Sequence, residues 1–282
     1  MAGEERGPGI KQILVALDAS AHGRAALEAA ARLARSLGAE LVGVYVEDAD
    51  VLGLPRVSFL RETDALSGEE RSIRREDLER RLRLEVARLR RAMEEAAGES
   101  EVRWSFRVTR GRVVTSLLEA ARSADLVSLG ARSHWMGRDP GSTTRAVVTR
   151  AGKPVMVLRK GATLGDRVCV LFDGSEAARK SLAQAAGLSG LREDTDLFVV
   201  LHGPSGTTRQ LRNEATSVLE EAGVGEEPSF STLMTREPEE ILDHLCSIGC
   251  GLVVISRDRF TDSEVRLRRI LGRVGCPLLL TG

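Results

Sequence analysis

One pattern occurs twice in this chain: an apolar run of five residues, an aspartate directly after it, and a serine two residues later. The first copy ends at Asp18 and Ser20, and the second ends at Asp173 and Ser175, at an offset of 155 residues. A continuous apolar run is typical of a central strand in a parallel sheet, and the serine can cap a following helix. The duplication therefore predicts two copies of one α/β unit in tandem.

Apolar runs alternate with amphipathic segments through both copies. A helix stopped by Gly38 follows the first run, and a long charged helix is expected over residues 68–97 after an irregular stretch at 47–67. Strand, helix and strand at this spacing form right-handed βαβ units, so each copy is predicted to be a doubly wound domain with five parallel strands. The predicted strands are residues 13–17, 41–46, 102–108, 125–129 and 155–158, then 168–172, 197–201, 229–234, 252–255 and a last strand after Pro277.

A short glycine-containing linker separates the two predicted domains, which span residues 1–160 and 166–282. The offset between matching residues falls from 155 at the first strand to 126 at the fourth. The first copy therefore carries about thirty additional residues, mostly at 47–80 within an elaborated 47–97 region. On the long helix of this region, Leu78, Leu82, Val86, Leu89 and Met93 form an apolar stripe.

The charge balance argues against several classes of partner. Lys+Arg and Asp+Glu both number 41, so no overall field favours nucleic acid. The chain contains no run of about 18 apolar residues and begins without an apolar signal core, which predicts a cytoplasmic protein that does not insert into membranes.

The four cysteines all lie in the second copy, three of them beside apolar runs. For a cytoplasmic protein this pattern predicts buried, reduced thiols. Cys246 and Cys250 lie near His244, but three ligands at one helix end are weak evidence for zinc, and we predict no metal site.

The stretch from residue 129 to 144 carries the strongest sign of chemistry. Gly130 follows the fourth apolar run, and Gly141 and Ser142 open the next amphipathic segment. A glycine turn at the carboxyl end of a strand that leads into a helix start leaves backbone N–H groups available for an anion such as a phosphate.

These features together resemble the universal stress protein family, and specifically its tandem two-domain members. The strand-end aspartate with a nearby serine, the five-strand alternation and the Gly-Ser loop before the last helix carry the resemblance, which covers nearly the whole chain. It implies a sheet in the order 3-2-1-4-5 in each domain and a pseudo-dimer paired across the last strands.

In ATP-binding members of the family, the loop after the fourth strand has the form G-x2-G-x9-G-[ST] and surrounds the phosphates, while the first-strand aspartate contacts the adenine or ribose side. The resemblance thus implies an ATP site in the first domain, with Mg²⁺ if the nucleotide is bound. Ser133 stands where the second glycine belongs, the loop is two residues short, and Gly137 offers a shifted glycine. The implied site residues are Asp18, Ser20, Gly130, Ser133, Gly137, Gly141, Ser142 and Thr143.

The second copy departs from this loop. Ser256 to Arg259 follow its fourth strand, with no glycine in the next dozen residues, so this domain is predicted to have a degenerate nucleotide loop. Asp173 then has two interpretations, as a ligand contact or as a partner of the helix start.

No catalytic residues are predicted. The chain has no P-loop, no G-x-S-x-G elbow and no H-E-x-x-H motif. Nothing in the sequence around His202 provides the partner residues of a catalytic group. His22 either lines the cleft or lies on the surface of a helix start.

We expect a non-catalytic stress-response or regulatory protein. A nucleotide-independent interaction module that docks a protein partner through its 47–97 region is the alternative, a slow ATPase is a weaker one, and homo-oligomerisation is left open.

Overall fold

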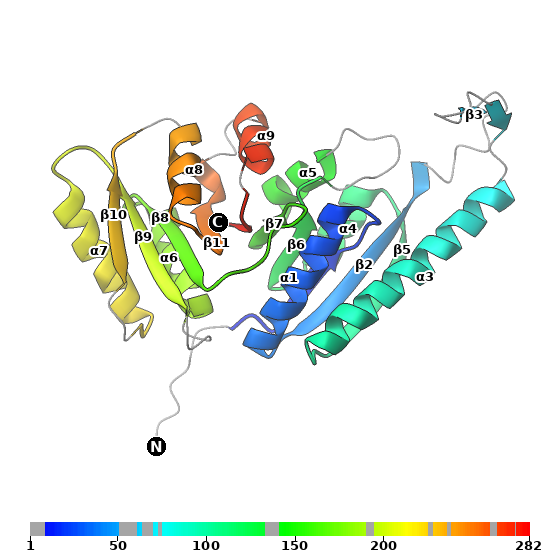
Figure 1. The fold of residues 1–282 in the computed structure, drawn as a ribbon, viewed down its shortest axis with the longest axis horizontal. Helices are drawn as coiled ribbons and strands as arrows, with labels where there is room; N and C mark the ends of the chain where they lie inside the picture. The colour runs from blue at the N-terminus through cyan, green and yellow to red at the C-terminus, as the bar shows by residue number, and fades with distance from the viewer. Residues whose placement is uncertain are drawn as a thin grey trace, which may run out of the picture.

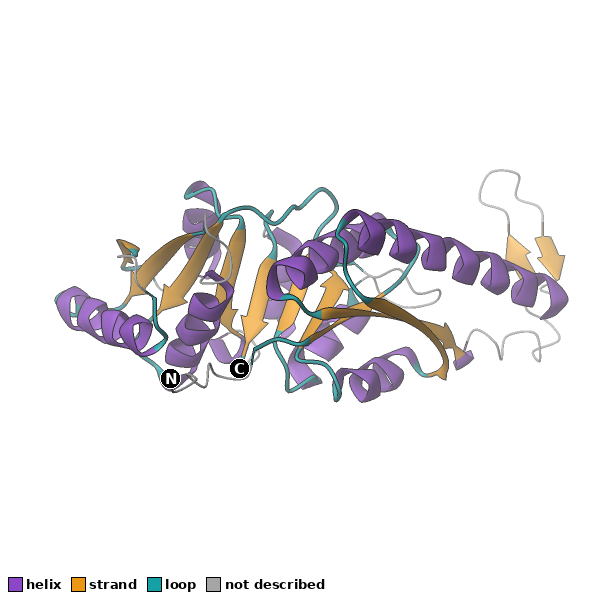
Figure 2. Ribbon diagram, turned by 90° about the horizontal axis from the view of Figure 1, so that it is seen from below, coloured by secondary structure: helices purple, strands orange, loops and turns teal. Residues whose placement is uncertain are grey.

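A computed structural model describes residues 9–50, 61–63, 70–72, 75–132, 141–189, 195–224, 228–235, 238–259, 264–273 and 275–282. Its centre is one ten-stranded sheet in the order β10-β9-β8-β11-β12-β7-β6-β1-β2-β5, with helices on both sides (Figures 1 and 2). A separate two-stranded sheet pairs β3 with β4.

The strands and helices alternate along the chain in both halves. The first half contains β1 (Gln12–Ala16), α1 (Ala21–Leu37), β2 (Glu40–Asp48), β3 (Arg61–Thr63), β4 (Glu70–Ser72), α3 (Arg75–Glu99), β5 (Trp104–Gly111), α4 (Val113–Ala121), β6 (Leu126–Gly130), α5 (Ser142–Arg150) and β7 (Val155–Leu158). The second half contains β8 (Arg167–Phe172), α6 (Glu176–Ser189), β9 (Asp196–His202), α7 (Thr208–Glu221), β10 (Ser229–Leu233), α8 (Pro238–Ser247), β11 (Leu252–Ser256), the 3₁₀ turn η2 (Arg257–Arg259), α9 (Glu264–Arg273) and β12 (Leu278–Thr281).

Each half of the sheet has the order 3-2-1-4-5, with all strands inside a half parallel. The halves meet where β12 pairs antiparallel with β7, in a register that places Leu278 opposite Val157 and Leu280 opposite Val155. The predicted architecture and the predicted pairing across the last strands are therefore confirmed. Because the junction is antiparallel, the carboxyl ends of the strands point to opposite edges of the sheet in the two halves.

The helices pack on the sheet through the apolar faces that the sequence predicts. Ser20 accepts a hydrogen bond from the Gly23 amide at the start of α1, and Gly38 ends the helix in the left-handed region at φ 62°. α3 packs against α1, β2 and β5. Its predicted stripe is confirmed: Leu78, Leu82, Leu89 and Met93 are buried, and Val86 is partly buried.

Two predicted boundaries are wrong. The long helix begins at Arg75 rather than at residue 68, because residues 70–72 pair antiparallel with residues 61–63 inside the stretch predicted to be irregular. The third strand, predicted over residues 102–108, is observed as Trp104–Gly111, and its last residues, Arg110 and Gly111, pair with Glu47 and Asp48. In both places pairing with another segment outweighs the local preference for helix or turn.

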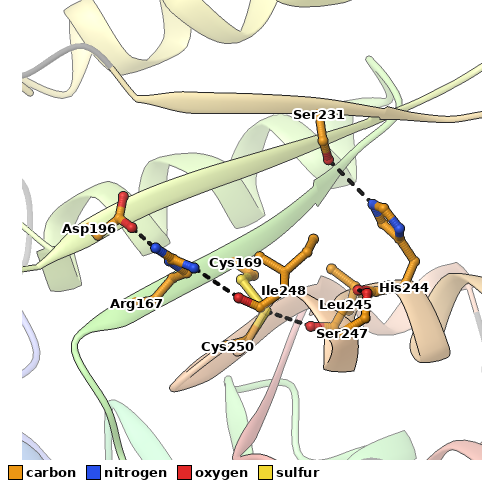
Figure 3. The surroundings of a disulfide bond; sticks show 9 residues. All are labelled: Arg167, Cys169, Asp196, Ser231, His244, Leu245, Ser247, Ile248 and Cys250. Atoms are coloured by element: carbon orange, nitrogen blue, oxygen red, sulfur yellow. Dashed lines mark hydrogen bonds and ion pairs between the residues drawn. A yellow bond between two sulfur atoms is a disulfide. The ribbon is translucent and has the colours of Figure 1, made fainter.

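The prediction of reduced thiols is also wrong for one pair. Cys169 on β8 and Cys250 just before β11 form a disulfide with their Cα atoms 5.8 Å apart (Figure 3). The two cysteines are 81 residues apart in sequence, and the pairing of β8 with β11 brings them together. Cys250 is therefore a disulfide partner and not a metal ligand.

A buried arginine joins the two halves beside the antiparallel junction. Arg257, on η2 of the second half, donates to the carbonyl of Val148 on α5 at 2.9 Å and to the carbonyl of Lys153 before β7. It also lies 3.4 Å from the Thr281 carbonyl on β12. Burial lowers the pKa of this guanidinium. Its hydrogen bonds to backbone carbonyls of both halves compensate for the lost hydration.

Within the described residues, no helix is both long enough and apolar enough to cross a membrane.

Two glycines give a matched test of the packing between the linker and the second half. A Cβ on Gly251 would overlap the backbone of Gly165, whose amide donates to the Gly251 carbonyl. We predict that Gly251→Ala lowers the free energy of unfolding by about 1–3 kcal/mol, because the linker must shift. Gly187 lies in α6 with open space around it, so Gly187→Ala should raise that free energy by about 0.5–1 kcal/mol. Urea denaturation of both variants checks the pair, and equal effects would contradict the packing argument.

Candidate functional site

In a doubly wound sheet, ligands bind outside the carboxyl ends of the strands, at the point where the strand order reverses. In the first half this point is the end of β1 and β6, next to the start of α1, and we name it the first cleft. The Asp18 carboxylate is buried and accepts hydrogen bonds from the Ser20 amide at 3.0 Å and the Ser20 hydroxyl at 2.6 Å. The same hydroxyl oxygen accepts from the Gly23 amide at 2.9 Å. Asp18 thus orients the capping serine of α1 and places a negative charge at the helix N-terminus, where the helix dipole favours it.

Gly130, at the end of β6, is held tightly against this helix start. A Cβ on Gly130 would lie 2.8 Å from both the Gly23 amide nitrogen and the His22 carbonyl carbon. A Cβ on Gly23 would in turn collide with the Asp18 carboxylate. Both positions therefore require glycine for the close approach of α1 to β6.

The start of α5 is tied to the same point. Gly141 is the N-cap of α5 in the left-handed region at φ 82°, and within the described residues no side chain caps the first turn. The Thr144 hydroxyl donates to the Gly130 carbonyl at 2.7 Å, and Thr143 is buried beside it. The positive end of α5 is thereby fixed next to the carboxyl ends of β1 and β6.

The site residues predicted from the sequence fall into two groups. Ser133 and Gly137 lie outside the described residues. The structure brings the others together at one edge of the first half: Asp18, Ser20, Gly130, Gly141, Ser142 and Thr143.

Two further polar groups face this region and were not predicted. Tyr45 on β2 is hydrogen-bonded to Glu85 on α3, and the Asp18 carboxylate lies within electrostatic reach of Glu85. Burial, with a contribution from Asp18, raises the pKa of Glu85, and burial beside Glu85 raises the pKa of Tyr45. The signal was available, because Glu85 lies on the stripe face of α3, three residues after Leu82 and four before Leu89.

His22 connects the start of α1 to the segment after β7. Its Nδ1 atom accepts a hydrogen bond from the Lys160 amide at 3.0 Å. Partial burial lowers the pKa of His22, and the positive charges of Arg159 and Arg132 lower it further. His22 therefore lies beside the cleft among three cations, Arg132, Arg159 and Lys160.

The second half has a corresponding cleft with different contents. Asp173 accepts from the Ser175 amide at 3.1 Å, and its other carboxylate oxygen pairs with the Arg259 guanidinium. Arg259 also reaches Nδ1 of His202 at 2.6 Å, while Nε2 of His202 lies 2.5 Å from the Thr235 carbonyl. These contacts join Asp173, Arg259 and His202 in one hydrogen-bonded network, which sequence reasoning missed.

Asp173 has the surroundings of a residue in an internal ion pair. Burial would raise the pKa of Asp173, but hydrogen bonds from Ser175 and the charge of Arg259 outweigh it and hold the pKa below its usual value. A cavity of about 210 Å³ remains beside the pair, bounded by the ends of β8 and β11. Asp173 thus accepts a hydrogen bond at the start of α6, and Arg259 of the same chain neutralises its charge.

A larger hollow of about 620 Å³ lies elsewhere, between α1 and α3. Arginines and glutamates line it together, among them Glu28, Arg32, Arg35 and Glu99. It borders the last turns of α1, away from Ser20, and so does not belong to the cleft. Among the residues that the structure describes, no group of three or more histidine, cysteine, aspartate or glutamate side chains could hold a metal ion.

The fold and the first cleft define a doubly wound α/β protein with a helix N-terminus and a strand-end aspartate at one sheet edge. A family model described as the universal stress protein family matches residues 9–159. The chain belongs to this family. A comparison with curated proteins found no match.

Solved structures share the fold over nearly the whole chain. A universal stress protein from Archaeoglobus fulgidus is 15% identical, with a TM-score of 0.72 over 95% of this chain and 97% of that one. A functionally unknown protein from Pseudomonas aeruginosa is 14% identical, with a TM-score of 0.57 over 96% and 92%. A putative universal stress protein from another strain of that species is 14% identical, with a TM-score of 0.56 over the same shares. At these identities the likeness establishes the fold alone.

The hydrogen bond from the Lys160 amide to His22 should make the stability of the protein depend on pH. A protonated Nδ1 could no longer accept from the Lys160 amide, and the neighbouring cations oppose the charge. Because the pKa of His22 is lower in the folded protein than in the unfolded chain, this contact contributes its full stability above about pH 6.5. The contribution is lost as the pH falls through the folded pKa.

NMR titration of the imidazole should therefore give a pKa below about 6.5. His22→Asn keeps an acceptor that does not titrate, so this variant should lose less stability than the parent between about pH 6.5 and 5. A pKa at or above the ordinary value, or identical stability profiles, would contradict the interpretation.

Proposed function

We propose that the protein is a non-catalytic stress-response regulator whose first half binds an adenine nucleotide, ATP with Mg²⁺, in the cleft between β1 and β6. The observation that carries the proposal is the start of α5. Gly141 provides a left-handed N-cap without a side chain, and the Thr144 hydroxyl ties this helix start to Gly130. The phosphates would lie against the amides of Ser142 and Thr143 and would accept a hydrogen bond from the Ser142 hydroxyl.

The charges around the cleft also favour an orientation of the nucleotide with its phosphates near the start of α5. Arg132, Arg159 and Lys160 surround His22 and provide positive potential for phosphates. Asp18, Tyr45 and Glu85 form the acidic and hydroxyl side, which suits the hydroxyl groups of a ribose or the amino group of adenine. The nucleotide would thus lie with its base towards β2 and its phosphates towards α5.

We propose further that the chain consists of two domains, residues 1–160 and 166–282, and that only the first binds nucleotide. Arg259 already neutralises Asp173 and reaches His202 in the second cleft. A cavity of about 210 Å³ lies beside them, and drug-sized ligands usually occupy sites of about 300–1,000 Å³. The second domain would then serve as the structural partner of the first.

Calorimetric titration with ATP and Mg²⁺ tests the proposal. We expect one site per chain, weakened about tenfold or more by Ser142→Ala and by Asp18→Asn. The Asp18→Asn change keeps an oxygen that can accept from Ser20, so helix capping survives while the charge is lost.

Asp173→Asn is the matched control, because Asp173 occupies the equivalent place at the end of β8. It should leave ATP affinity unchanged. Absence of heat and of a thermal shift at millimolar ATP would refute nucleotide binding. A loss of affinity in Asp173→Asn alone would show that ATP binds in the second half and not in the first.

A second candidate function rests on the long helix. α3 extends beyond the main sheet towards the small β3–β4 sheet (Figure 2), and Leu84 on it is 67% exposed. The projecting end of α3, together with the β3–β4 sheet, extends past the main sheet and offers a helix surface on which a protein partner could dock without nucleotide. Removal of residues 50–66 or Leu84→Glu should abolish such a complex, whereas survival of the complex in both variants would exclude this surface.

A further inference from the structure

The turn that carries Cys250 is anchored to β8 on both sides of the cysteine, and Figure 3 shows the contact of Arg167 with Ile248 on one side. The Arg167 guanidinium donates to the Ile248 carbonyl at 2.8 Å, and the Arg167 carbonyl accepts from the Gly251 amide at 2.8 Å. Both bonds join the turn to the strand that also carries Cys169. The sulfur of Cys250 is therefore held near Cys169 by contacts that do not include the disulfide.

Arg167 is itself fixed in place. Its Nε atom lies 2.6 Å from the Asp196 carboxylate, and its guanidinium lies 5.9 Å from the centre of the Phe198 ring. Both partners belong to β9, which pairs with β8 in register. The anchor thus depends on sheet pairing and an ion pair, and it should persist when the disulfide opens.

The surroundings of the sulfurs suit the reduced state as well as the oxidised one. Sγ of Cys250 lies 2.8 Å from the Leu245 carbonyl in the last turns of α8. A disulfide sulfur has no hydrogen to donate, but a Cys250 thiol can donate to this carbonyl. Cys169 is fully buried on β8, where a neutral thiol packs as a small apolar group.

The two cysteine residues differ slightly in exposure. Cys169 is 0% exposed and Cys250 is 8% exposed. Cys250 belongs to a turn between two glycines, and Gly249 is exposed and in the left-handed region at φ 75°. Cys250 is therefore the more exposed residue of the pair, so an external thiol would attack its sulfur, with Cys169 as the leaving group.

We propose that Cys169 and Cys250 form a reversible thiol–disulfide pair, preorganised by Arg167, that makes the stability of the second half depend on redox conditions. In reduction, a thiolate of a small dithiol attacks Sγ of Cys250, the bond to Cys169 breaks, and Cys169 leaves and takes a proton. The second thiol of the reagent then displaces Cys250, so two cysteine thiols and one oxidised dithiol result. In oxidation by a small linear disulfide, the Cys250 thiolate attacks one sulfur and releases the first small thiol. The Cys169 thiolate then attacks Sγ of Cys250 in the mixed disulfide and releases the second small thiol.

The consequence follows from the position of the bond. It joins strand β8 to the turn after α8 and closes a loop that contains most of the second half. Loop closure restricts the unfolded chain, so oxidation should raise the resistance of this half to unfolding. The first cleft is built from β1, β6, α1 and α5, none of which contains a cysteine, so its ligand affinity should not change.

The test uses the full chain with Cys246→Ser and Cys276→Ser, which leaves only the proposed pair. After reduction with dithiothreitol and its removal, oxidised glutathione is added to the folded protein and to the same protein in urea. Thiols are then trapped with N-ethylmaleimide and counted by mass spectrometry. We expect the intramolecular step, from the mixed disulfide with glutathione to the Cys169–Cys250 bond, to be at least about tenfold faster in the folded protein, because the effective concentration of the second thiol is higher there.

Arg167→Met should slow closure in the folded protein towards the rate in urea. Arg212→Met is the matched control, since Arg212 lies over Phe230 elsewhere in the same half, and it should leave the rate unchanged. Oxidation should also raise the melting temperature.

Equal rates in the folded and unfolded chain, or failure of the folded chain to close the bond, would overturn the proposal. If Arg167→Met proved destabilised by circular dichroism, the comparison of folded with unfolded parent protein would still decide it.

Discussion

The antiparallel pairing of β7 with β12 is the constraint on which the rest of the structure depends. Every residue of both strands is buried, so either half alone would expose an apolar sheet edge. Their pairing covers both edges at once and produces one sheet of ten strands. It also turns the carboxyl ends of the two halves in opposite directions, so each cleft must be completed by its own half.

The two clefts show how one backbone pattern supports different chemistry. In both, an aspartate at the end of the first strand accepts from the amide of a serine two residues later, at the start of a helix. After the fourth strand of the first half, Gly130 allows close packing and α5 begins at a glycine. The second half has Arg259 in that region, and its guanidinium occupies the aspartate's remaining oxygen. A ligand would have to compete with this internal ion pair.

Local features of the structure could be predicted from the sequence. The apolar runs of the parallel strands, the cap at Ser20, the helix end at Gly38 and the stripe on α3 depend on residues close to one another in the chain. The residues at the first cleft were also predictable, because strand-end positions of parallel strands share one edge of the sheet. The fit of a nucleotide there remains a prediction.

Contacts between distant segments could not be predicted in this way. The pairing of Cys169 with Cys250, the network of Asp173, Arg259 and His202, and the Tyr45–Glu85 pair each join separate elements. The sequence by itself determined the tandem α/β architecture, since hydrophobic period and capping chemistry act over a few residues. Only the tertiary structure decided which polar and sulfur groups meet, because those distances are set by strand order and packing.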